Sequence, residues 1–116
     1  MEQEAFDIEV GSMENRRSER HEVQVAGAWR QRNNYSRDVW IKDISETGCR
    51  FHDRFSILEV DTDILIRIGR IDKIGPIPAR VRWREGHTVG ASFDTQLHPG
   101  VLGHIVKFMS EKTDNE

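Results

Sequence analysis

The feature that most constrains the fold of this chain is an alternation of apolar and polar side chains over short segments. The clearest case is Ala79, Val81 and Trp83, which alternate with three arginines. Alternation with a period of two predicts a β-strand that faces a core on one side and solvent on the other. The pattern therefore predicts a strand over residues 79–84, with Trp83 in the core.

Five further segments alternate in the same way, and turn-forming residues such as Asn33 and Asn34 separate them. Their apolar positions are Val23 and Val25, Val39 and Ile41, Cys49 and Phe51, Ile64, Ile66 and Ile68, and Val89, Ala91 and Phe93. About six short strands joined by turns predict an all-β fold, an antiparallel barrel or sandwich.

The last part of the chain changes period. From Val101 to Met109 apolar residues recur at helical spacing, directly after Pro99 and Gly100. This pattern predicts an amphipathic C-terminal α-helix of about ten residues. We expect its apolar face to pack on the barrel, and a helix that binds a partner is the alternative.

Length and composition predict a single domain in the cytoplasm. The 116 residues are enough for one hydrophobic core, and no apolar run approaches the roughly 18 residues of a membrane span. The first ten residues are acidic and lack the pattern of a signal peptide. Cys49 is the only cysteine, which excludes an intrachain disulfide and a cysteine metal cluster, and we expect it to be a small core residue.

The net charge of −3 is unevenly distributed. Residues 1–15 hold five acids and no Lys or Arg, and residues 111–116 hold three acids and one lysine, which leaves 16 bases and 12 acids in residues 16–110. We therefore expect a flexible acidic N-terminal tail over residues 1–14, a barrel domain over residues 15–110 and a C-terminal tail over residues 111–116. A mildly basic domain suits a small anion, and we do not expect it to bind nucleic acid, because general nucleic-acid binders are more basic.

Three arginines, Arg16, Arg17 and Arg20, lie just before the first predicted strand. By itself such a cluster is usually a solvated run of charge. Guanidinium groups also fit phosphate oxygens and the O6/N7 edge of guanine, and they can stack on a purine. Because three neighbouring cations repel one another, a bound diphosphate would relieve that repulsion.

A second group, Asp43, Ser45 and Gly48, lies between the second and third predicted strands. These residues are typical of a plain turn, in which Gly48 supplies a positive φ. They also suit a ligand: Asp43 can accept hydrogen bonds from guanine N1–H and N2–H₂, Ser45 can add a short contact, and Gly48 would let the backbone approach the base. Both interpretations stay open for the turn alone.

Together the two groups form an RxxxR motif followed by a DxSxxG motif, and this pair resembles the PilZ domain family. Residues 77–83 and 89–93 resemble two late strands of that family, so the resemblance covers residues 15–108. PilZ domains are six-stranded antiparallel β-barrels with a helix, and many are receptors for the bacterial second messenger cyclic di-GMP. The resemblance implies this fold and this ligand, with no cofactor.

The resemblance also implies roles for the motif residues. Arg16 and Arg20 would bind the phosphates and stack on guanine, with Arg17 as an additional arginine. Asp43 and Ser45 would contact the guanine edge, and Gly48 would form the tight turn. The motifs depart from the family at Thr47, where a second glycine is common, and at Asn15, where some members have another arginine. The number of nucleotides bound, one or a stacked pair, therefore stays open.

These features predict a binding protein that relays a signal to a protein partner. In this hypothesis residues 10–20 fold over cyclic di-GMP, and the acidic tail competes with the nucleotide for the arginines. A PilZ-fold adaptor that acts by protein contact without nucleotide is the alternative. We expect no enzyme and no catalytic residue, because no neighbourhood combines a nucleophile with a base. The five scattered histidines predict no metal site.

Overall fold

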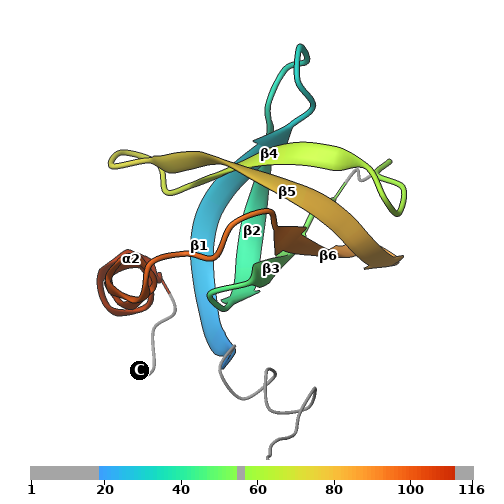
Figure 1. The fold of residues 1–116 in the computed structure, drawn as a ribbon. Coiled ribbons are helices and arrows are strands. Elements are labelled where there is room, and N and C mark those ends of the chain that lie inside the picture. Colours follow the sequence, from blue (N-terminus) through green and yellow to red (C-terminus); the bar gives the residue numbers. More distant parts are fainter. Residues whose placement is uncertain (1–18, 55–56, 112–116) are drawn as a thin grey trace, which may run out of the picture.

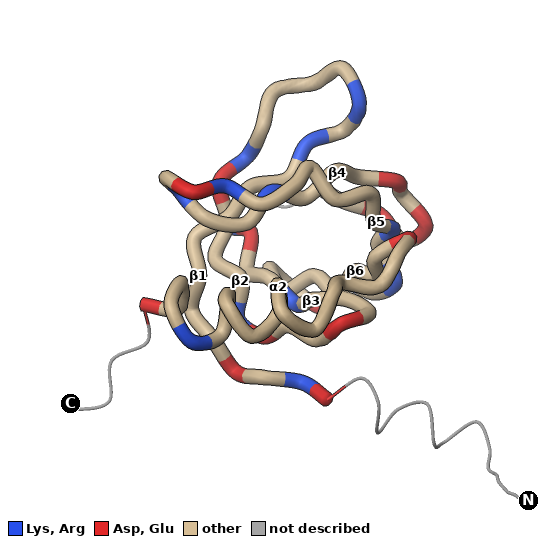
Figure 2. The backbone as a smooth tube through the Cα atoms, turned by 60° about the vertical axis from the view of Figure 1, so that its left-hand side comes forward, with Lys and Arg blue, Asp and Glu red and all other residues tan. Residues whose placement is uncertain are grey.

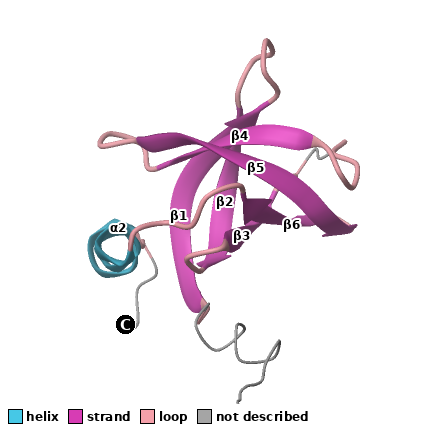
Figure 3. Ribbon diagram, in the orientation of Figure 1, coloured by secondary structure: helices cyan, strands magenta, loops and turns pink. Residues whose placement is uncertain are grey.

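The computed structural model describes residues 19–54 and 57–111, and it is dominated by β-strands (Figure 3). Its elements are β1 (His21–Arg30), β2 (Arg37–Ile44), β3 (Gly48–His52), β4 (Asp63–Ile68), β5 (Ile74–Glu85), β6 (Thr88–Phe93), α2 (Pro99–His104) and the π-helical turn η1 (Ile105–Met109). All neighbouring strands are antiparallel and close into a barrel in the order β1-β2-β3-β6-β5-β4 (Figure 1). The predicted six-stranded antiparallel barrel with a C-terminal helix is therefore confirmed.

The barrel interior is filled by the alternating apolar residues of all six strands. Ile41 and Phe51 are fully buried and face each other across β2 and β3, and Val81 faces Ala91 across β5 and β6. The predicted alternation is thus confirmed in every strand except at the end of β5. Because the interior is filled by apolar side chains and both edges of every strand are paired, the outer surface is the part of the sheet that can bind a ligand.

Trp83 does not lie in the core, so the sequence-based prediction for it was wrong. The pairing of β5 with β6 shifts register between Val81 and Trp83, where Val81 faces Ala91 and Trp83 faces Gly90. The additional residue on β5 is a β-bulge, and a bulge reverses the side to which the following side chains point. Trp83 consequently lies on the outer face, 39% exposed.

The C-terminal helix lies at one end of the barrel, beside β1 (Figures 1 and 2). His98 caps it, because its Nδ1 accepts a hydrogen bond from the backbone N–H of Gly100 at 2.9 Å. Leu102 and Ile105 are buried and belong to the same core as the strands, which confirms the packed helix. In the described residues, no helix combines the length and the apolar character needed to cross a membrane.

Candidate functional site

Arg20 and Asp43 belong to the two motifs, and the fold brings them into contact. Arg20 lies just before β1 and Asp43 lies near the end of β2, and these two strands are paired. Arg20 Nη1 donates a hydrogen bond to Asp43 Oδ1 at 2.6 Å. The other two arginines of the first motif, Arg16 and Arg17, lie outside the described residues.

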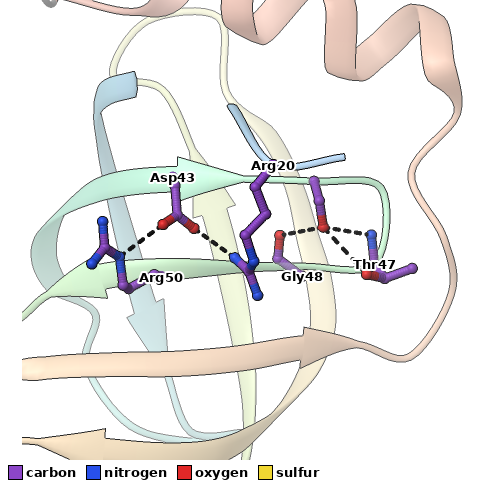
Figure 4. Close-up of polar contacts among 6 residues, drawn as sticks. Arg20, Asp43, Thr47, Gly48 and Arg50 are labelled. Atoms are coloured by element: carbon purple, nitrogen blue, oxygen red, sulfur yellow. Dashed lines mark hydrogen bonds and ion pairs between the residues drawn. The ribbon is translucent and has the colours of Figure 1, made fainter. Parts of the chain in front are cut away.

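Asp43 is held between two guanidinium groups (Figure 4). On the side opposite Arg20, Nε of Arg50 lies 2.8 Å from Asp43 Oδ2. Asp43 is 8% exposed, whereas the Arg20 side chain is 56% exposed. A nearly buried carboxylate therefore anchors two guanidinium groups at the surface of the barrel, one from the residue before β1 and one from β3.

The contact of Arg50 with Asp43 is an ion pair without hydrogen-bond geometry. Nε of Arg50 is buried and has no hydrogen-bond partner in the described part of the chain, although the carboxylate is close. Native proteins leave few buried donors without an acceptor. The acceptor nearest to this donor is the Asp43 carboxylate, so the contact with Asp43 is what compensates the buried Nε–H.

Ser45 acts within its own turn. Its Oγ accepts a hydrogen bond from the Thr47 N–H at 3.2 Å, and its backbone N–H donates to the Gly48 carbonyl at 2.9 Å. The Ser45 side chain is 1% exposed, so it fixes the turn that follows Asp43. The plain-turn interpretation accounts for the contacts that Ser45 makes in the structure.

Gly48 is required for a different reason from the one predicted. It is absent from the glycines with positive φ, which are Gly69, Gly75 and Gly86. A Cβ atom at Gly48 would instead collide with the carbonyl oxygen of Ala91 on β6. The DxSxxG glycine therefore permits the close approach of β3 and β6.

A row of residues crosses the outer face beyond Asp43. Asp43 faces Arg50 across β2 and β3, Arg50 faces Gly90 across β3 and β6, and Gly90 faces Trp83 across β6 and β5. The Trp83 ring lies over Gly90, where any Cβ would collide with it. The row thus places an exposed aromatic ring beyond the Asp43 and Arg50 charges.

Sequence reasoning did not identify Arg50 and Trp83 as site residues. Arg50 could have been found, because a tight turn over residues 45–48 places it directly opposite Asp43 in an antiparallel pair. Trp83 could not, since its place depends on the bulge in β5, which alternation alone does not reveal.

An open groove of about 370 Å³ adjoins these residues on the outer face, and we call it the Arg50 groove. It is lined by Glu22, Val23, Gln24, Lys42, Arg50, His52 and Thr88. Lys42 Nζ donates to Gln24 Oε1 at 3.1 Å, which ties β2 to β1 along the groove floor. The groove can therefore hold part of a polar ligand beside the Asp43 carboxylate.

Two kinds of chemistry find little support in the described residues. No group of three or more potential metal-ligating side chains occurs among them. Cys49 is buried, and this burial together with the nearby Asp43 charge raises the pKa of its thiol to about 12. A thiol with so high a pKa is a poor nucleophile at neutral pH, in agreement with its predicted place in the core.

The sequence model of one family, the PilZ domain, matches residues 14–111. The chain is a PilZ domain. This family membership covers nearly the whole chain and agrees with the closed barrel and with the resemblance of the two motifs. PilZ domains generally bind cyclic di-GMP and act as binding or adaptor domains. Among curated proteins, no relative matches this PilZ domain.

Proposed function

We propose that this PilZ domain binds cyclic di-GMP and relays the signal to a protein partner. The ligand-binding residues in this proposal are Arg16, Arg17, Arg20, Asp43, Ser45 and Gly48, joined by Arg50 and Trp83. The observation that carries the proposal is the contact of Arg20 with Asp43, because it joins one arginine of the RxxxR motif to the aspartate of the DxSxxG motif at the barrel surface.

The chemistry of the site matches the parts of a guanine nucleotide. The Asp43 carboxylate accepts from guanine N1–H and N2–H₂, because Oδ1 has a second lone pair beyond the one that Arg20 uses and the contact of Oδ2 with Arg50 lacks hydrogen-bond geometry. Arg20 is exposed enough to turn toward a phosphate. The Arg50 side chain is partly exposed and adds a second positive charge beside the carboxylate, and the Trp83 ring offers a stacking face.

A relay starts from the attachment of β1 to the C-terminal segment. The N–H of Gln24 donates to Ser110 Oγ at 3.0 Å, and the N–H of Glu111 donates to the Gln24 carbonyl at 2.7 Å. Gln24 also lines the Arg50 groove. Arg20 lies just before β1, and Gln24 in the same strand holds the residues that follow the C-terminal helix. A shift of β1 on nucleotide binding would therefore move this C-terminal segment, where a partner can detect it.

Titration calorimetry with cyclic di-GMP tests this proposal on three forms of the full chain. Wild type and Arg32→Gln should bind the nucleotide, because Arg32 is exposed on the β1–β2 hairpin and away from the site. Arg20→Gln removes the same charge from the site and should lose most of the binding. If folded wild-type protein gives no heat, the nucleotide-independent PilZ adaptor becomes the better account.

A further inference from the structure

A second and larger groove lies on the outer face of β1, β2 and β4, and we call it the Trp40 groove. Its volume is about 590 Å³, and it meets the Arg50 groove at His52, which lines both. Ala26 and Ala28 of β1 form its floor, with Trp40 opposite Ala26 and Arg67 opposite Ala28 on the flanking strands. Small residues between two long ones produce the hollow.

The Trp40 groove is strongly basic, and its charges are not balanced within the structure. Arg67, Arg70 and Lys73 line it, and none of them forms an ion pair with any residue that the structure describes. The guanidinium of Arg70 lies over the Trp40 ring, 5.4 Å from its centroid. Among the described residues that line the groove, Asp38 is the only acid. Three unpaired cations around one hollow repel one another, and an anionic occupant would offset that repulsion.

The rim of the groove adds apolar side chains to this charge. Tyr35 is 96% exposed and precedes Ser36 in the lining, and Ile71 is 91% exposed and follows Arg70. Both lie in loops that project from the barrel, the β1–β2 hairpin and the β4–β5 connection (Figure 1). Trp, Tyr and Arg are the residue types that dominate protein-protein contacts. The groove therefore fits a peptide that combines carboxylates with apolar side chains better than it fits a plain anion.

The chain itself contains such a peptide. In residues 6–10, Phe6, Ile8 and Val10 alternate with Asp7 and Glu9. An extended peptide with this alternation presents its acids on one side and its apolar side chains on the other. Nine residue steps separate Val10 from Glu19 and can span about 30 Å, whereas the part of β1 between His21 and Ala28 is about 23 Å long. The segment can therefore reach the groove of its own chain.

We propose that residues 6–10 bind in the Trp40 groove, with Asp7 and Glu9 directed to the unpaired cations. The segment then occupies a site apart from the Arg20–Asp43 contact. One consequence rests on the proposed function: a nucleotide that draws Arg16 and Arg20 together pulls on the same stretch of chain and releases the segment. Docking itself requires no nucleotide, so it can be tested separately.

A spin label on the full chain gives a direct test. Gly11→Cys introduces a reactive thiol next to the segment, while the buried Cys49 stays unlabelled. In nitrogen-15 spectra without nucleotide, the label should broaden the Trp40 indole N–H and the Gly69 and Arg70 amides. Broadening of the residues around Arg20 and Arg50 alone would overturn the proposal, because the acidic segment would then cover the arginine cluster. The absence of localised broadening would overturn it as well.

Charge removal provides the control. The pair Arg67→Gln and Arg70→Gln should abolish the broadening at Trp40, and Arg32→Gln in the hairpin should leave it unchanged. In the spin-labelled chain that keeps Arg67 and Arg70, a higher salt concentration should weaken the broadening, since the contact is ionic. Broadening that survives both treatments would contradict the proposal. Spin-labelled chains at natural nitrogen abundance, mixed with nitrogen-15 chains that carry no spin label, should show no broadening. Broadening in this mixed sample would place the segment in the groove of a second copy and would contradict the proposal.

Discussion

Arg20 and Asp43 are separated by 23 positions in the sequence, yet their side chains are joined by a 2.6 Å hydrogen bond at the outer surface of the barrel. The bond depends on the pairing of β1 with β2, which places the start of the first strand beside the end of the second. Since Arg50 approaches the same carboxylate from β3, Asp43 is the centre of the site.

Asp43→Asn should weaken cyclic di-GMP binding more than it weakens the fold. The amide keeps the size of the side chain but removes the charge that holds two guanidinium groups and presents an acceptor to guanine. We expect a loss of about 1–3 kcal/mol in unfolding free energy, because Arg50 Nε then lacks its counter-charge. Urea unfolding and titration calorimetry measure the two effects.

Asp63→Asn is the control for this variant. Asp63 pairs with Arg80 at 3.0 Å, but its side chain is 74% exposed, and such solvent-screened surface pairs contribute little to stability. Nucleotide binding should be unchanged. Equal effects of Asp43→Asn and Asp63→Asn on binding would show that Asp43 has no special role.

Gly48→Ala should destabilise the barrel by about 1–3 kcal/mol, because the new Cβ collides with the Ala91 carbonyl oxygen. Gly103→Ala in α2 is a matched control, since nothing lies within 4 Å of the added atom. It should be neutral or stabilise by up to about 1 kcal/mol through helix propensity. Thermal unfolding of both variants measures these stabilities. If Gly48→Ala is as stable as wild type, the close approach of β3 and β6 does not require a glycine at this position.

Trp83→Leu should weaken nucleotide binding and leave the fold nearly intact. The ring is 39% exposed and lies over Gly90, so its loss removes a stacking surface and little of the core. Stacking of a base on an aromatic ring contributes about 1–3 kcal/mol, which predicts a clear rise in the dissociation constant. Trp29→Leu would instead destabilise, because Trp29 is buried and its Nε1 donates to Asp53 at 2.7 Å. If Trp83→Leu binds the nucleotide with unchanged affinity, the Trp83 ring does not contribute to the site.

The sequence was sufficient to predict the fold because apolar and polar residues alternate in each strand. Val25, Ile41 and Phe51 are buried as their alternation predicts, although the pairings of β1 with β2 and of β2 with β3 contain register shifts. Positions that depend on pairing between strands could not be predicted in this way. The bulge after Val81 moves Trp83 from the expected core to the surface, and the need for Gly48 arises from a carbonyl on another strand.

The thiol of Cys49 should make the stability of the protein fall at high pH. Burial raises its pKa from 9.0 to about 12, with the Asp43 charge as a further cause. Because the folded-state pKa is raised, the unfolded chain ionises first above pH 9, and the contribution of the neutral thiol is lost as pH rises through about 12. Urea unfolding of wild type and Cys49→Ala between pH 8 and about 11 measures this difference. Parallel pH profiles would contradict it.

The central claim is that the Asp43 site recognises guanine, and a comparison of cyclic di-GMP with cyclic di-AMP tests it most directly. Adenine lacks the N1–H and N2–H₂ donors that the Asp43 carboxylate would accept. In calorimetric titrations with ligand up to about 50 µM, cyclic di-GMP should bind and cyclic di-AMP should give no heat. Equal binding of both nucleotides, or no binding of cyclic di-GMP to the folded protein, would contradict the account.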